Sequence, residues 1–94
     1  MLICLDYDGT YTEDPSLWDL FIQAATASGH QVICATMRYE EVEGDTVKIS
    51  LGHLVDKIYF TNRLAKVNWL KERGINPDVW IDDSPFWLLN NAVT

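Results

Sequence analysis

Cysteine is scarce in this sequence of 94 residues: there are two, and no Cys-x-x-Cys pair, so neither a disulfide framework nor a zinc-finger spacing is expected. Cys4 and Cys34 fall in apolar runs and are predicted to be reduced and buried. No apolar run approaches the ~18 residues of a membrane-spanning helix, and no basic stretch typical of a secretory signal precedes the first run. We therefore expect a cytoplasmic protein that does not enter a membrane.

Basic residues are also few. Seven Lys and Arg are scattered along the chain against 14 Asp and Glu, which gives a net charge of −7. Proteins that hold nucleic acid by charge alone need clustered Lys and Arg, so this function is disfavoured. An acidic chain can still bind phosphate where a bound cation inverts the local field.

Hydrophobic residues make up 48% of the chain and occur in short runs that alternate with segments of helical spacing. This alternation predicts one α/β domain over residues 1–94, a small Rossmann-like three-layer sandwich around a parallel sheet of about four strands. Asp14-Pro15 and Gly29 are a typical start and stop for the first helix. We expect strands at 2–5, 31–36, 57–60 and 78–81, and helices at 15–28, 40–55, 62–74 and 85–91.

The segment 40–55 carries conflicting signals. Val47, Leu51 and Leu54 recur at helical spacing, whereas the stretch TVKIS alternates like a strand, and Gly44 and Gly52 weaken a helix. We predict that it is mostly helical.

Polar residues follow each predicted strand. Because ligands of parallel α/β sheets bind beyond the carboxyl ends of the strands, these residues should converge on one edge. Lys66, one turn into the third predicted helix, could reach the same edge. The residues at the strand ends are Asp6, Asp8, Gly9, Thr10, Thr36, Arg38, Asp82 and Asp83.

Four carboxylates at one edge repel one another unless a cation lies among them. Mg²⁺ takes oxygen ligands and binds through carboxylates and substrate phosphate oxygens, so we expect Mg²⁺ held by Asp6, Asp8 and Asp83. A carboxylate aimed at phosphorus is a nucleophile, and a second one two residues on can transfer the proton. Lys66 and the Thr36 hydroxyl would stabilise the phosphoryl oxygens.

The stretch LDYDGT resembles the first motif of the haloacid dehalogenase (HAD) superfamily, DxDGT after a hydrophobic strand. VICAT resembles its second motif, IDDS its acidic fourth motif, and Lys66 its motif-three lysine, with Lys57 as the competing candidate. The resemblance implies a Mg²⁺-dependent phosphatase that forms an aspartyl-phosphate on a phosphorylated substrate.

Roles for individual residues also follow from the resemblance. Asp6 would be the nucleophile, and Asp8 the general acid/base that also ligates the metal through its main-chain carbonyl. Asp83 would be the fourth-motif ligand, with Asp82 as a second ligand or as the partner of the lysine. Gly9, Thr10 and Arg38 are predicted to bind the substrate rather than the metal.

The chain departs from the family pattern because the segments after motifs one and two are too short for a cap domain. An open site suits large or exposed phosphorylated substrates. Two other functions stay open. One is a metal- and phosphate-binding module with weak turnover. The other is a nucleic-acid 3′-end phosphatase, because Arg38 and IDDS also resemble, more weakly, the phosphatase half of phage polynucleotide kinase. A second copy of the chain could act as the cap.

Ordinary structural readings compete with these predictions. Asp-x-Asp-Gly also occurs in plain turns, and Lys66 or Arg38 could be solvated surface residues. Three tryptophans, Trp69, Trp80 and Trp87, are interpreted as core residues, whereas Trp18 lies near the predicted site entrance.

Overall fold

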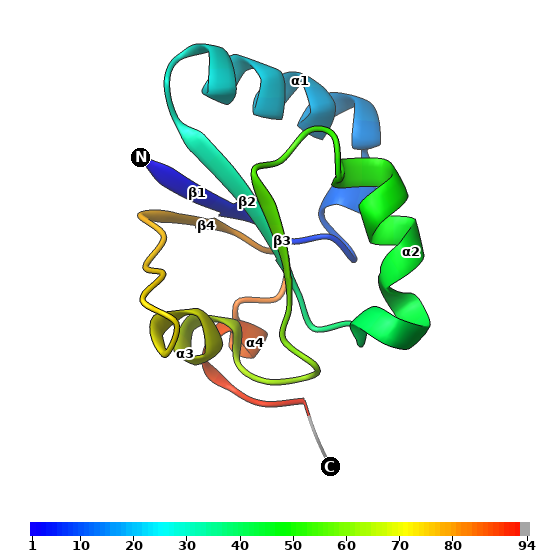
Figure 1. Cartoon of the computed structure of the whole chain (residues 1–94), viewed down its shortest axis with the longest axis vertical. Coiled ribbons are helices and arrows are strands. Elements are labelled where there is room, and N and C mark those ends of the chain that lie inside the picture. Colours follow the sequence, from blue (N-terminus) through cyan, green and yellow to red (C-terminus); the bar gives the residue numbers. More distant parts are fainter. Residues whose placement is uncertain (93–94) are drawn as a thin grey trace.

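The computed structural model, which describes residues 1–92, contains a four-stranded parallel sheet in the order β3-β2-β1-β4 (Figure 1). The strands are β1 (Leu2–Leu5), β2 (Gln31–Thr36), β3 (Lys57–Phe60) and β4 (Val79–Ile81). The α/β class, the parallel pairing and the four strands are as predicted.

Helices cover both faces of the sheet and make three layers (Figure 1). Helices α1 (Pro15–Ala27) and α2 (Glu40–Leu51) bury their apolar residues on one face, in the larger core cluster. Helix α3 (Lys66–Lys71) packs on the other face, and α4 (Phe86–Leu89) packs against α3. The segments between β1 and β2 and between β2 and β3 hold α1 and α2, together with a short 3₁₀ turn at Tyr11–Glu13.

Strand β1 is continuously apolar because both of its faces are covered. Leu5 points into the cluster under α1 and α2, whereas Cys4 points toward α3. Cys34 pairs in register with Leu5 and lies on the same side as Leu5. The two cysteines are buried, free and on opposite faces of the sheet, as expected for small hydrophobic side chains.

The boundaries of α1 follow its end signals. Asp14 Oδ1 accepts a hydrogen bond from Leu17 N at 3.2 Å, and Pro15 occupies the first helical position. After Ser28 the chain turns at Gly29, whose φ is +88°.

The segment 40–51 is helical, so the strand-like alternation of TVKIS does not decide its structure. Gly44 is tolerated because it faces the Phe60 ring, which lies 3.2 Å from where a Cβ would stand. The helix ends at Leu51, and residues 52–55 form turns rather than a continuation, which corrects the predicted boundary.

The helix predicted at 62–74 begins four residues later, at Lys66, and ends at Lys71. Asn62 and Arg63 have φ of +53° and +69°, which no α-helix accommodates. The Thr61 hydroxyl donates to the Leu64 carbonyl at 2.8 Å and fixes this turn. The last helix is likewise shorter than the predicted 85–91, at Phe86–Leu89.

The sheet order creates a switch point beside β1. The chain passes from β1 through β2 to β3 on one side and then returns to form β4 on the other side of β1. A crevice beyond the carboxyl ends of β1 and β4 is the usual ligand position in such a sheet. Among the described residues, no helix has the length and apolar character needed to cross a membrane.

Candidate functional site

Three carboxylates from the two strands at the switch point meet in space. Asp6 follows β1, while Asp82 and Asp83 follow β4, and one oxygen atom of each lies within 4.8 Å of the others. The Asp6 N–H donates to the Ile81 carbonyl at 2.9 Å and ties the two strand ends together. The predicted convergence of Asp6 with the Asp82-Asp83 pair is therefore present.

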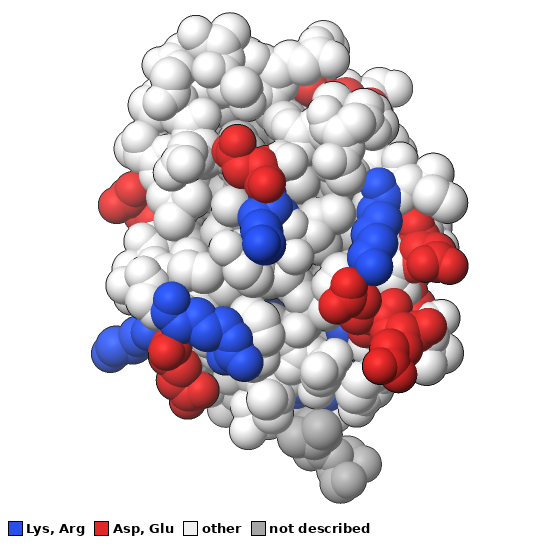
Figure 2. Space-filling view, in the orientation of Figure 1, with Lys and Arg blue, Asp and Glu red and all other residues white. Residues whose placement is uncertain are grey.

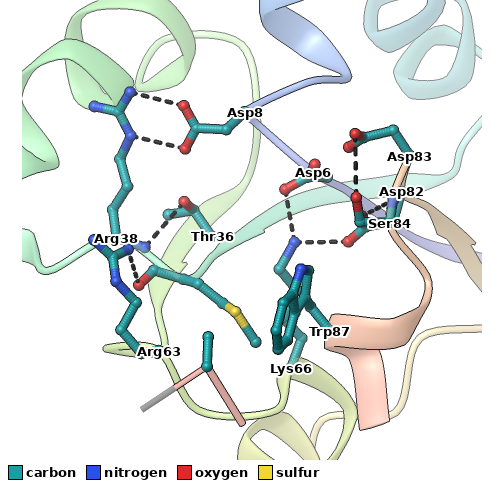
Figure 3. Close-up of a pocket in the computed structure, with 12 residues that line it drawn as sticks. Asp6, Asp8, Thr36, Arg38, Arg63, Lys66, Asp82, Asp83, Ser84 and Trp87 are labelled. Atoms are coloured by element: carbon teal, nitrogen blue, oxygen red, sulfur yellow. Dashed lines mark hydrogen bonds and ion pairs between the residues drawn. The ribbon is translucent and has the colours of Figure 1, made fainter. Parts of the chain in front are cut away.

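Lys66 lies between two of these carboxylates (Figure 3). Its Nζ is 2.6 Å from Asp6 Oδ1 and 2.6 Å from Asp82 Oδ2, and the residue is only 4% exposed. Lys57, the competing candidate, starts β3 and is exposed at the opposite end of that strand. Of the two lysines, Lys66 is the one at the carboxylate cluster.

Burial and ion pairing act against each other in this cluster. Burial raises the pKa of Asp6 to about 7, despite the opposing attraction and hydrogen bond of Lys66. Burial pulls the pKa of Lys66 down, but its pairing with Asp6 and Asp82 outweighs this and raises it above the usual value. Asp6 therefore gains a proton at a pH far above that of an ordinary carboxyl group, while Lys66 stays charged.

Gly9 and Thr10 support the cluster from behind Asp83. Asp83 Oδ2 lies 2.4 Å from where a Cβ on Gly9 would stand, so only glycine leaves room for this carboxylate, and its φ of +82° also favours glycine. The Thr10 hydroxyl is 3.1 Å from Asp83 Oδ1 and 3.3 Å from Asp6 Oδ2 and accepts from Asp83 N. Both residues, predicted to contact substrate, are seen here in contact with carboxylates.

Asp8 points away from the cluster (Figure 3). Its Oδ1 and Oδ2 accept from Arg38 Nη2 at 2.8 Å and Nε at 2.9 Å, and its side chain is 53% exposed. The Asp8 carboxylate is therefore not among the three that meet, because its two-pronged pairing with Arg38 holds it at the pocket edge. Metal ligation by Asp8, through its carboxylate or its main-chain carbonyl, stays a prediction.

Arg38 and Arg63 are held in place by a shared acidic residue. Arg38 Nη1 donates to the Glu43 carbonyl at 2.9 Å, and Arg63 Nη2 donates to Glu43 Oε1 at 2.9 Å. The two guanidinium groups also lie over the rings of Tyr7 and Tyr39. These anchors fix both arginines at the edge of the site.

Thr36 ends β2 beside the same site and is 1% exposed. Its Oγ1 accepts a hydrogen bond from the Arg38 N–H at 3.3 Å. The hydroxyl proton is therefore available to an oxygen atom in the pocket.

A pocket of about 380 Å³ contains Asp6, Asp8, Thr36, Arg38, Lys66, Asp82 and Asp83. Its charged lining comprises these four carboxylates and three cations, Lys66, Arg38 and Arg63, a formal charge of −1. The lining also includes five residues that were not among the site residues predicted from the sequence: Met37, Arg63, Ser84, Trp87 and Ala92.

Trp87 corrects one prediction, because it lines this pocket and is 37% exposed instead of lying in the core. Its position only four residues after Asp83 was the sequence signal that could have placed it there. Trp69 and Trp80, in contrast, pack as expected against the smaller apolar cluster under α3, which is formed by Cys4, Ile33, Ala35 and Leu70. Trp18 borders a separate hollow beside Gly9 and Asp83.

The donor set fits a hard divalent cation. All three cluster ligands are carboxylate oxygens, which Mg²⁺ prefers, and the missing Cβ of Gly9 makes the space in which Asp83 stands. Asp82 accepts short hydrogen bonds from Lys66 Nζ at 2.6 Å and from Ser84 N at 2.9 Å. In contrast, Asp6 Oδ2 and both oxygens of Asp83 accept only longer bonds of 3.1–3.3 Å from the hydroxyl groups of Thr10 and Ser84. Asp6 and Asp83 are thus the better placed pair for a metal, with Asp82 as the partner of the lysine.

Charged residues of both signs are interspersed on the face shown in Figure 2, where no continuous basic stripe is seen. Comparisons with protein-family models, with curated proteins and with solved structures found no match to this chain. The functional argument therefore depends on the residues of the site.

Proposed function

We propose that this chain is a Mg²⁺-dependent phosphomonoester hydrolase of the HAD type, with Asp6 as nucleophile. The observation that carries this proposal is the meeting of Asp6, Asp82 and Asp83 within 4.8 Å, next to the buried Lys66, at the switch point of a parallel sheet. A pocket that opens onto Asp6 gives a phosphoryl group access to the carboxylate.

In the first step an Asp6 carboxylate oxygen attacks phosphorus, the bond to the ester oxygen breaks, and Asp8 gives that oxygen a proton. In the second step Asp8 takes a proton from water, whose oxygen attacks the phosphorus of the phosphoaspartate and releases inorganic phosphate and free Asp6. Lys66 and Thr36 stabilise the phosphoryl oxygens. Bound at Asp6 and Asp83, Mg²⁺ would offset the negative charge of the phosphoryl group.

Asp8 needs a change of position for this role. Its carboxylate is held by Arg38 at the pocket edge, so it has to turn toward the phosphoryl group. Because Arg38 lines the same pocket, a substrate anion that draws the guanidinium would release Asp8 at the moment of binding.

Turnover of an aryl phosphate with and without Mg²⁺ tests the proposal. We expect activity that EDTA removes and that Asp6→Asn abolishes, since an amide is neither a nucleophile of this kind nor a charged ligand. Asp45→Asn, a change at an exposed acidic residue of α2, is the control and should keep the rate. Equal rates for Asp6→Asn and the unmodified chain would refute the nucleophile assignment.

A binding module with weak turnover is the second candidate, favoured by the pairing of Asp8 with Arg38 away from Asp6. Beryllofluoride mimics a phosphoryl group on a carboxylate. A beryllofluoride complex that Asp6→Asn prevents, together with no turnover of any phosphorylated compound, would identify this function instead.

The nucleic-acid 3′-end phosphatase is less well supported. The pocket arginines, Arg38 and Arg63, are each paired with a carboxylate, and the net charge is −7. Binding of a 3′-phosphorylated oligonucleotide that weakens steeply with salt would support it.

A further inference from the structure

Trp87 stands out among the residues that line the pocket, because its ring is exposed in an otherwise mostly polar wall. Trp87 is 37% exposed and lines the same pocket as Asp6 and Lys66. Figure 3 labels Trp87 among the residues that line the pocket. A large aromatic surface at such a position is typical of ligand pockets, where rings stack.

The Trp87 ring is not used for internal packing as the other tryptophans are. Arg73 covers the face of Trp69 at 3.4 Å, and Trp80 packs into the cluster under α3. Within residues 1–92, Trp87 meets the edge of Phe86 but has no cation over its face and no hydrogen bond from its indole nitrogen. Its face is therefore available to a ligand.

A short backbone segment connects Trp87 to the acidic pair. Asp83, Ser84 and Pro85 lead directly into α4, and the Trp87 N–H donates to the Ser84 carbonyl at 3.0 Å. Proline limits the freedom of this turn. The ring is thus positioned by the same short segment that carries the acidic pair.

The two residues differ in exposure. Asp6 is 6% exposed and Trp87 is 37% exposed, and both line the same pocket. A ligand that uses both would place its phosphoryl group at the buried carboxylate and a flat group on the more exposed ring. The volume of about 380 Å³ is at the small end of the range for small-molecule pockets, about 300–1,000 Å³.

We propose that the substrate is a nucleoside monophosphate, whose base stacks on Trp87 while its phosphate reaches Asp6. This inference rests on the proposed function, which places the phosphoryl group at Asp6, and it specifies a nucleoside as the leaving group. In such a substrate the sugar links the phosphate to the base, and stacking on an aromatic ring accepts any base because every base has a flat π face.

The test compares adenosine 5′-monophosphate with ribose 5-phosphate, which lacks the base. We expect kcat/KM to be about tenfold or more higher for the nucleotide, the change that one stacked base brings. Trp87→Leu should reduce this ratio toward one, and Trp87→Phe should retain part of it. Leu89→Ala, a change at an exposed residue of the same helix that does not line the pocket, is the control and should keep the ratio.

A binding measurement separates this inference from the proposed function. Calorimetry on Asp6→Asn with Mg²⁺ should show tighter binding of the nucleotide than of ribose 5-phosphate, and adding Trp87→Leu should remove the difference. If neither the unmodified chain nor any variant turns over a substrate, but the difference in binding is found, the phosphatase proposal fails and the assignment of a nucleotide ligand stands.

Other outcomes would overturn the inference. Equal kcat/KM for nucleotide and ribose 5-phosphate, or a ratio that Trp87→Leu leaves unchanged, would show that the ring does not contact the leaving group. If phosphotyrosine is turned over faster than the nucleotide and this turnover depends on Trp87 in the same way, the substrate is an aryl phosphate instead. Circular dichroism on each variant checks that it is folded.

Discussion

At the scale of single residues, Lys66 decides whether the carboxylates can be buried together. Its ammonium is 2.6 Å from both Asp6 and Asp82, and all three side chains are nearly excluded from water. A buried pair of this kind contributes little compared with an apolar replacement, but removal of one partner leaves an uncompensated charge. The lysine is therefore expected to be essential to the fold as well as to the site.

Replacement of Lys66 by methionine tests this charge balance. We expect Lys66→Met to lower the free energy of unfolding by about 3–5 kcal/mol, measured by urea denaturation, because two buried carboxylates lose their cation. Lys57→Met, at the exposed start of β3, should change it by about 0.5 kcal/mol or less. The double variant Lys66→Met, Asp6→Asn should regain part of the lost free energy of unfolding. Similar stabilities for Lys66→Met and Lys57→Met would contradict the prediction.

The raised pKa of Asp6 predicts an unusual pH dependence for the metal-free chain. Folded Asp6 keeps its proton up to a pKa of about 7, whereas an ordinary aspartate has a pKa of 3.8 and releases its proton near that pH. Between these values the folded state binds more protons than the unfolded state, so stability falls as pH rises, by up to about 1.4 kcal/mol per pH unit. The stability that the Asp6 proton contributes is fully present below pH 3.8 and is lost above about pH 7.

Urea denaturation in EDTA from pH 4.5 to 8 measures this effect. Asp6→Asn cannot titrate at this position, so the unmodified chain should lose stability relative to the variant across the window. Two curves that stay parallel would show that Asp6 ionises normally in the folded chain.

Gly9 is predicted to matter for the metal site beyond its backbone conformation. Gly9→Ala would place a Cβ 2.4 Å from Asp83 Oδ2, and Gly29→Ala, at a φ of +88°, would meet nothing within 4 Å. Both should lose about 1–2 kcal/mol from the left-handed backbone. Only Gly9→Ala should also weaken Mg²⁺ binding in calorimetry, because Asp83 has to move; equal Mg²⁺ affinity in the two variants would refute this.

At the scale of elements, local signals decide where α1 begins. Asp14 caps the helix through Leu17 N, so Asp14→Ala should cost about 0.5–2 kcal/mol in thermal or urea unfolding. Glu13→Ala, at the neighbouring exposed residue, is the control and should have little effect. A loss of the same size in both would indicate a general charge effect rather than a cap.

Elements with such local signals were predictable, and those set by distant contacts were not. The strand 31–36 was predicted to the residue, since its apolar run ends where the sheet ends. The start of α3 was missed because Asn62 and Arg63 take left-handed conformations, held by contacts of Arg63 with Met37 and Ala92 that no local pattern reveals. The acidic strand ends were identifiable from motif spacing, whereas the turn of Asp8 toward Arg38 depends on a pairing across 30 residues.

At the scale of the whole molecule, a bound divalent cation should stabilise the chain as a unit. If Mg²⁺ binds only the folded state, a concentration 100 times its dissociation constant adds about 2.7 kcal/mol, and for a domain of this size each kcal/mol raises Tm by about 4–8 °C. We expect Tm to rise with MgCl₂ over NaCl of equal ionic strength. Asp83→Asn should remove most of the rise, and a Tm that does not respond to Mg²⁺ would count against the metal site.

The sheet order has a consequence for how the chain is made. Strand β1 leaves the ribosome before β4, yet β4 pairs along one side of it, and Asp78 next to β4 accepts a hydrogen bond from the Leu2 N–H across 76 residues. During synthesis that side of β1 is an open apolar edge, the kind of surface on which nascent chains pair with one another. Fragments that end before residue 79 should consequently be prone to aggregation, and they lack both Asp82 and the fourth strand of the sheet.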